Sequence, residues 1–193
     1  MPRIIRSAAK TLHCLSVLAL VAGGAARAAA LDYVIDPDHT YPSFEADHLG
    51  GLSTWRGKFN HTTGRVALDK AAGRGSVSVT VDMASADFGQ DHWHEVALGK
   101  DLFDVAKYPV ATFSGTLEGF AHGAPSRVDG RLTLHGVTRP LVLTIDSFKC
   151  MPHPLLKREV CGADALATFR RDAFGMDSGK SYGFNMDVTL LIQ

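Results

Sequence analysis

The chain has 193 residues, of which 46% are hydrophobic, with 20 basic and 20 acidic side chains. The first 30 residues carry four of the basic side chains and no acidic ones, which leaves 16 positive and 20 negative charges, a net charge of −4, in the remainder. A mildly acidic surface argues against nucleic acid as a partner, because phosphate binding needs a concentration of Lys and Arg. The length after residue 30 fits one domain with a sizeable core.

Residues 1–30 have the layout of a secretory signal peptide. Basic side chains lie at the start, and an apolar run follows over residues 12–21. This run is shorter than a membrane-spanning helix needs, and small residues offer cleavage sites near Ala28 and Ala30. We therefore expect a periplasmic or secreted protein whose mature part begins after one of these alanines. An uncleaved membrane anchor is the alternative.

Two cysteines, Cys150 and Cys161, remain after removal of the signal peptide. An even pair in an oxidising compartment favours a disulfide. Closing a loop of this size should stabilise the protein by about 3 kcal/mol on the chain-entropy model. A metal site shared with His153 is the alternative, although the spacing lacks the C-x-x-C pattern that is typical of such sites.

The mature chain is dominated by alternating apolar and polar residues, the pattern of strands with one buried face. Residues 76–83 place Val77, Val79, Val81 and Met83 on one face. The same alternation, bounded by turn residues, predicts strands at 31–36, 42–48, 56–60, 64–69, 110–118, 164–170 and 184–192, and a hairpin over 131–146. Many short strands separated by turns predict an all-β sandwich or barrel.

Residues 91–107 depart from this alternation. Their apolar side chains follow helical spacing, and Tyr108-Pro109 ends the segment because proline disfavours helix at the residue before it. We expect a short helical segment here. Such a segment can close one end of a barrel or pack on its outer surface, and the spacing is compatible with both.

Two short motifs suggest chemistry, and each has a plainer interpretation. Residues 179–183 read G-x-S-x-G around Ser181, but a nucleophile elbow needs a helix after the serine, and a strand is predicted there. His92 and His94 could share a metal ion on a strand, less easily on a helix. Further ligands would have to come from His39, His48 or His135. We therefore predict no enzyme, no catalytic residue and no bound metal.

Four blocks of the mature chain, taken in order, point to a known family. The chain opens with Ile35-Asp36-Pro37-Asp38-His39-Thr40, and the most specific block runs from Asp101 to Phe113. Leu132 to Pro140 forms another block, and Cys161 to Ala165 with Phe174-Gly175-Met176 forms the last. These blocks, in this order, resemble the YceI-like family of exported polyisoprenoid-binding proteins, and the resemblance covers the mature chain.

The resemblance implies an extended lipocalin-like antiparallel β-barrel of about eight strands over residues 31–193. It also implies a long apolar interior that holds an isoprenoid or similar amphiphilic chain, with no other cofactor, and a possible homodimer. The implied ligand-binding residues are His48, which could hydrogen-bond a head group, and apolar residues expected to line the interior: Phe44, Phe59, Val79, Leu98, Phe103, Phe113, Leu134 and Met186.

The leading hypothesis is therefore a periplasmic carrier or storage protein for a quinone, a quinone precursor or a polyprenyl chain. A membrane protein could donate or accept the ligand. The alternatives are an accessory partner of a membrane redox system, with a filled barrel interior, and an enzyme built on Ser181 or on His92 and His94.

Overall fold

The computed structural model describes residues 30–193, so all but the last residue of the predicted signal peptide lies outside it. The described chain forms eleven β-strands, one α-helix and three short 3-10 turns. The strands are β1 Leu31–Val34, β2 Ser43–His48, β3 Ser53–Phe59, β4 Thr62–Asp69, β5 Arg74–Asp82, β6 Ala86–Asp87, β7 Val110–Glu118, β8 Arg127–Leu134, β9 Val137–Pro152, β10 Glu159–Arg170 and β11 Asp187–Ile192. The helix is α1 Asp91–Leu98, and the turns are η1 Met83–Ser85, η2 Arg171–Phe174 and η3 Lys180–Tyr182.

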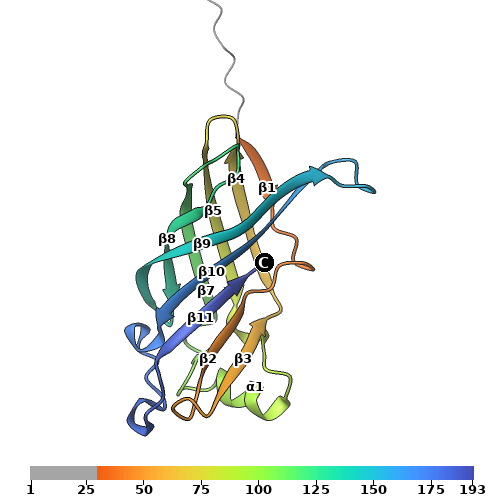
Figure 1. Cartoon of the computed structure of the whole chain (residues 1–193). Helices are drawn as coiled ribbons and strands as arrows, with labels where there is room; N and C mark the ends of the chain where they lie inside the picture. The colour runs from red at the N-terminus through yellow and green to blue at the C-terminus, as the bar shows by residue number, and fades with distance from the viewer. Residues whose placement is uncertain (1–29) are drawn as a thin grey trace, which may run out of the picture.

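All eleven strands belong to one sheet, in the order β1-β4-β5-β7-β8-β9-β10-β11-β2-β3-β6. Every neighbouring pair is antiparallel. The sheet curls on itself, with β4, β5 and β7 behind β9, β10 and β11 (Figure 1). This confirms the lipocalin-like antiparallel fold. The sheet has eleven strands rather than the expected eight. Its two edge strands are very short, with four residues in β1 and two in β6.

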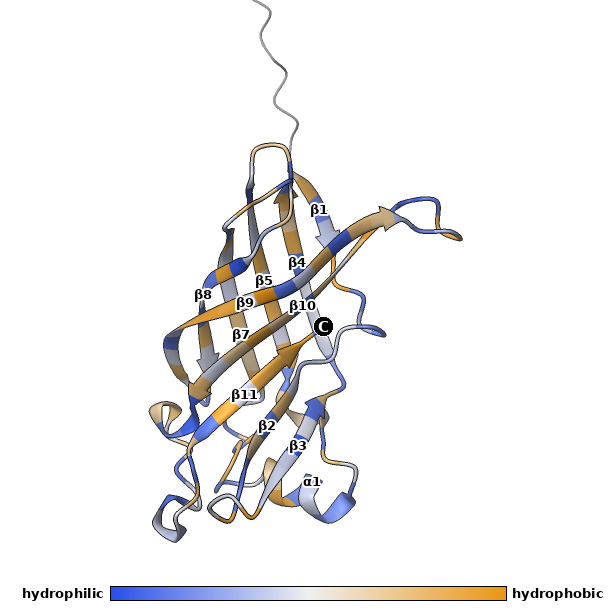
Figure 2. Cartoon of the chain, in the orientation of Figure 1, coloured by the Kyte–Doolittle hydropathy of each residue, from blue (hydrophilic) through white to orange (hydrophobic). Residues whose placement is uncertain are grey.

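The predicted alternation places one face of each strand inside the curl. In β5, Val77, Val79 and Val81 point inward, whereas Ser76 and Ser78 are exposed. Figure 2 shows the same alternation of apolar and polar residues along the strands. The closely packed part of the core is built from side chains such as Leu68, Leu117, Val128 and Phe174.

The β9–β10 hairpin is longer than predicted. The sequence predicts strands that end near residue 146 and begin near residue 164, but β9 continues to Pro152 and β10 begins at Glu159. This outer part has no fully buried side chain, because Lys149 and Met151 on one face are exposed and Cys150 on the other is only half-buried. Its sequence therefore lacks the alternation by which the other strands were recognised.

The helical segment is shorter than the predicted 91–107. The helix α1 ends at Leu98, and Gly99 follows in an extended conformation with ψ at 172°. Residues 99–107 form turns instead, in which Asp104 has a φ of 45° and its N–H donates to the carbonyl of Gly99. Glycine is a poor helix former, which explains the early end.

The helix lies at the lower end of the curled sheet, near β2 and β3 (Figure 1). Its residues Trp93 and Val96 line the interior cavity, so the helix closes this end of the sheet rather than packing on the outer surface. Within residues 30–193, no helix combines the length and apolar character that crossing a bilayer requires.

Candidate ligand-binding cavity

The curled sheet encloses a cavity of about 1330 Å³. Side chains from every strand except β6, and from α1, contribute to its walls. The wall is mainly aliphatic and aromatic, because the inward face of each strand carries the apolar half of the alternation. Ligand pockets for small molecules commonly have about 300–1,000 Å³, so this cavity is large enough for a long chain.

The interior is hollow rather than filled by side chains. Val77, Val79, Phe113, Ile145 and Leu190 all line the cavity, and all are only half-buried despite lying on the inner face of the sheet. In a close-packed core such side chains would contact protein atoms on every side. Here they face open space, so the inner surface is available to an apolar ligand.

A cluster of four phenylalanines, Phe44, Phe59, Phe88 and Phe103, forms one wall. The Phe44 ring lies 5.6 Å from Phe59, 5.5 Å from Phe88 and 6.3 Å from Phe103 between ring centroids. Gly57, which pairs with Phe44 across the strands, makes room for this ring. A Cβ atom at Gly57 would lie 2.6 Å from Cζ of Phe44, so any larger residue would displace the cluster.

Near α1 the cavity has an aromatic wall that includes an imidazole. Trp55 packs on Trp93 with ring centroids 4.6 Å apart, and His48 stacks on Trp55 at 5.3 Å. The Nδ1 atom of His48 hydrogen-bonds Ser53 Oγ at 2.8 Å, which holds the ring in place. The stack combines a broad apolar surface with a polar ring suited to a head group.

Arg171 lines the same cavity and is a buried cation, 8% exposed. Its Nη1 donates to the carbonyl of Met176 at 3.0 Å, and its Nη2 donates to the carbonyl of Ser178 at 2.5 Å. Burial lowers the pKa of this guanidinium, partly offset by Asp172, Asp177 and Asp47. No carboxylate among residues 30–193 forms an ion pair with it.

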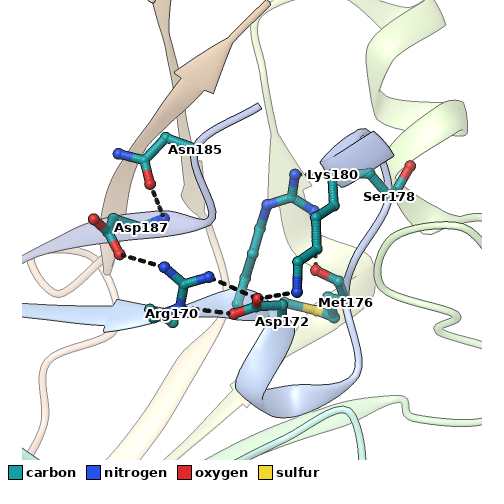
Figure 3. A network of polar contacts seen from close by, with 8 residues as sticks. Arg170, Asp172, Met176, Ser178, Lys180, Asn185 and Asp187 are labelled. Carbon is teal, nitrogen blue, oxygen red and sulfur yellow. Dashed lines mark hydrogen bonds and ion pairs between the residues drawn. The ribbon is translucent and has the colours of Figure 1, made fainter. Parts of the chain in front are cut away.

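The adjacent carboxylate, Asp172, is already paired with other cations (Figure 3). Arg170 donates to it through Nε at 3.1 Å and Nη2 at 2.7 Å, and Lys180 Nζ donates at 2.7 Å. These hydrogen bonds, with Arg170 first, hold the pKa of Asp172 well below its usual range. The network ties η2 to η3 and leaves the Arg171 charge facing mainly carbonyl oxygens.

A second polar group lies where β10 begins. Glu159 accepts hydrogen bonds from Lys70 Nζ at 2.7 Å and from the Tyr33 hydroxyl at 2.5 Å. Burial, and then the hydrogen bond to Glu159, raise the pKa of Tyr33 to about 12. Lys149 and Arg158 also border the cavity here. The apolar interior therefore has polar groups at two separate regions of its wall.

Seven of the nine ligand-binding residues expected from the sequence line the cavity. They are Phe44, His48, Phe59, Val79, Phe103, Phe113 and Leu134. Leu98 lies at the C-terminal end of α1 and packs against the core, and Met186 is 2% exposed just before β11, so neither belongs to the lining. Contact of any of them with a ligand remains a prediction.

Four prominent lining residues were not expected: Trp55, Phe88, Trp93 and Arg171. Trp55 shares the face of Phe59 in β3, and a strand predicted to begin at residue 53 rather than 56 would have identified it. Trp93 could have been predicted from its position on the same side of the helix as Val96, which also lines the cavity. The sequence carries no signal for Arg171, because its burial depends on the fold of η2 and η3.

The predicted disulfide is present. Cys150 and Cys161 face each other across β9 and β10, with Cα atoms 4.0 Å apart and the sulfurs bonded. Glu159 lies close to both sulfurs, but cysteines in a disulfide have no thiolate to offer a metal ion. The alternative of a metal site with Cys150, Cys161 and His153 is therefore incompatible with this structure.

The two catalytic hypotheses gain no support from the geometry. Ser181 lies in the 3-10 turn η3, and β11 follows, without the helix that a nucleophile elbow requires. No hydrogen bond joins Ser181 to a histidine within residues 30–193. His92 and His94 lie on α1, and in the described part of the chain they belong to no cluster of three possible metal ligands.

Comparison with known proteins gives the family. The family model described as a YceI-like domain matches residues 33–193. The chain belongs to the YceI-like family. Related UPF0312 proteins include one from Pseudomonas syringae pv. tomato, 37% identical over 139 residues, which cover 69% of this chain and 70% of the relative. One from Yersinia pestis is 38% identical over 137 residues, covering 69% of this chain and 70% of the relative.

Solved structures share the fold of this YceI-like protein. BcnA of Burkholderia cenocepacia superposes with a TM-score of 0.62 at 23% identity, covering 82% of this chain and 96% of that chain. A polyisoprenoid binding domain from Saccharophagus degradans gives a TM-score of 0.56 at 15% identity, covering 82% of this chain and 94% of that chain. These likenesses confirm the curled lipocalin-like architecture.

Proposed function

We propose that this YceI-like protein binds an isoprenoid-like amphiphile in its cavity and carries or stores it in the periplasm. The ligand would be a quinone, a quinone precursor or a polyprenyl chain. The observation that carries the proposal is the hollow apolar interior of about 1330 Å³. The signal-like N-terminus supports export, and the polyisoprenoid binding domain of Saccharophagus degradans, which shares the fold, supports the ligand class.

The energetics favour a hydrocarbon chain in this cavity. Transfer of one five-carbon isoprene unit from water gains about 4 kcal/mol gross, at about 0.8 kcal/mol per carbon. Loss of translational and rotational freedom and ordering of the chain offset several kcal/mol of this gain. A ligand of a few units therefore binds tightly without any catalytic or covalent group, and it is shielded from water.

The polar groups near α1 offer a place for the head group. His48 presents an imidazole beside Trp55, and the buried Arg171 guanidinium lines the same cavity. A carbonyl or other hydrogen-bond acceptor on the ligand would give Arg171 a partner besides the two backbone carbonyls it already contacts. We place the polar end of the ligand here, with its chain along the valines of β5.

The two tryptophans of the chain, Trp55 and Trp93, both line the cavity and provide a test. Addition of a short-chain ubiquinone should quench their fluorescence saturably. In the double variant Val77→Phe/Val79→Phe the added rings fill the chain path. The rings should keep about two carbons of the ligand out of the cavity, and the loss of their burial should weaken binding roughly tenfold.

Val142→Phe is the matched control, because Val142 is 51% exposed on the outer side of β9. Its affinity for the quinone should equal that of the wild type. Equal affinity of the double variant would place the quinone outside the cavity. Absence of quenching in the wild type, with no uptake of polyprenyl alcohols either, would contradict the proposed function. A filled-barrel redox partner has no support from this hollow interior.

A further inference from the structure

The outer part of the β9–β10 hairpin, residues 149–162, stands apart from the body of the molecule. We call this segment the finger. Figure 1 shows it extending beyond the curled sheet. Its base is fixed by the Cys150–Cys161 disulfide and by Glu159, which binds Lys70 and Tyr33.

The tip of the finger exposes apolar side chains. Leu155 is 83% exposed and Leu156 is 54% exposed, and Met151, near the end of β9, is 46% exposed. Single exposed leucines are common on proteins, but adjacent leucines at the end of a projecting hairpin form a compact apolar tip. Figure 2 shows apolar colour at the end of this loop among hydrophilic residues.

The tip is held in shape rather than left loose. The Nδ1 atom of His153 accepts hydrogen bonds from the N–H groups of Leu155 and Leu156, each at 3.1 Å. The N–H of His153 donates to the carbonyl of Arg158 at 2.8 Å and closes the loop. The leucines are therefore presented in a fixed arrangement, which lowers the entropy cost of inserting them into another phase.

The finger is basic although the mature chain as a whole is acidic. Lys149, Lys157 and Arg158 are all exposed and form no ion pair among residues 30–193, although Arg158 also attracts the Asp36 carboxylate electrostatically. The acid of the finger, Glu159, is paired with Lys70 from the β4–β5 turn. Two cations next to the apolar tip, Lys157 and Arg158, and a third at the base of the finger complement an anionic surface that also has an apolar interior.

The finger is continuous with the cavity. Met151, Leu156, Arg158 and Val160 belong both to the finger and to the lining of the cavity. An amphiphile that moves along the inner side of the finger therefore stays in contact with apolar side chains between the tip and the interior.

We propose that the finger docks on an anionic phospholipid bilayer, with Leu155 and Leu156 inserted at the interface and the basic side chains on the lipid phosphates. This inference rests on the proposed function, because docking would bring the cavity to the membrane in which its ligand dissolves. Basic residues at a bilayer surface and inserted leucines are the combination that holds peripheral proteins on membranes.

Flotation of the mature protein with vesicles tests the proposal. Vesicles of phosphatidylcholine and phosphatidylglycerol should bind the wild type, and the binding should fall with added salt. Vesicles of phosphatidylcholine alone should bind it far less. Leu155→Ser/Leu156→Ser and Lys157→Glu/Arg158→Glu should each reduce the partition coefficient at least tenfold, because each removes one of the two attractions.

Leu52→Ser/Lys100→Glu is the control. Leu52 is 72% exposed between β2 and β3, and Lys100 is exposed just after α1, outside the finger and the cavity lining. This variant should float like the wild type. An equal loss of vesicle binding in the control and in the finger variants would overturn the proposal. Absence of binding of the wild type to the anionic vesicles would also overturn it. A finger variant that turns a dimer into a monomer in sedimentation would assign the tip to a second copy, and would also overturn it.

Delivery of the ligand from ethanol separates this inference from the proposed function. The single variant Leu155→Ser changes a residue of the tip that does not line the cavity. It should bind a short-chain ubiquinone added from ethanol as the wild type does, yet extract it from anionic vesicles at least tenfold more slowly. Ubiquinone binding by a wild type that shows no affinity for the vesicles would defeat the finger inference alone. Absence of ubiquinone binding from ethanol would instead defeat the proposed function.

Discussion

At the scale of single residues, Asp172 shows how the structure holds the polar wall of the cavity. Its carboxylate accepts from both Arg170 and Lys180, and these cations keep its pKa well below the usual range. A carboxyl with a lowered folded-state pKa adds stability above its ordinary pKa of 3.8, and this contribution is lost as the pH falls further. The loops that carry Arg171 and Ser178 depend on this network.

We therefore predict that Asp172→Asn lowers the melting temperature at pH 7 by a few degrees. The difference from the wild type should narrow as the pH falls below 3.8, because the Asp172 carboxylate takes up a proton in the unfolded chain before it does so in the folded protein. Thermal unfolding followed by circular dichroism measures both. Asp129→Asn is the control, because Asp129 pairs with Arg127 where both side chains are 48% exposed, and such pairs contribute little. A gap between wild type and Asp172→Asn that does not change with pH would contradict the assigned role.

The sequence predicted single residues well where they belong to an alternating strand. Val79 and Phe113 line the cavity because each lies on the apolar face of its strand. Arg171 could not be predicted, since a basic residue after a strand normally lies in solvent and its burial depends on the loops that follow. Leu98 has the right spacing, but the helix turns Trp93 and Val96 toward the cavity instead.

At the scale of elements, the disulfide joins the outer ends of β9 and β10, where neither strand has a fully buried side chain. Its effect should therefore be local. Reduction should lower the free energy needed to open the finger by up to about 3 kcal/mol. Amide exchange in the finger should then be faster by a factor on the order of a hundred.

Hydrogen exchange of the oxidised and reduced protein checks this prediction. Amides of residues 149–162 should exchange faster after reduction, while β5 and β7, which pair with strands on both sides, keep their protection. Cys150→Ala/Cys161→Ala should behave like the reduced protein. A uniform loss of protection over the whole sheet would show that the disulfide stabilises the complete fold rather than the finger.

Elements with one buried face were predictable, and the others were not. The β5 strand alternates because its valines line the cavity and its serines face water. The outer β9–β10 hairpin buries no side chain fully, so its sequence shows no clear alternation of apolar and polar residues. The spacing of its apolar residues predicts the helix. That spacing does not show that the backbone leaves the helical conformation at Gly99.

At the scale of the whole molecule, the proposed function depends on the empty volume that the curled sheet encloses. The sequence implied an apolar interior by resemblance, but a hollow and a filled barrel have the same alternation. The size of the cavity follows from the curvature of the sheet and from the side-chain volumes that meet inside it. Half-buried Val77, Val79 and Leu190 on the inner face are what distinguish the hollow case.

The central claim is that this cavity holds an isoprenoid-like lipid, and native mass spectrometry tests it most directly. The protein would be purified from the exported fraction of its own host, weighed intact, and then extracted for lipid identification. We predict a stoichiometric adduct that organic extraction releases as an isoprenoid or a similar long-chain amphiphile. A clean apo mass, with no uptake of added isoprenoid quinones or polyprenyl alcohols, would contradict the account.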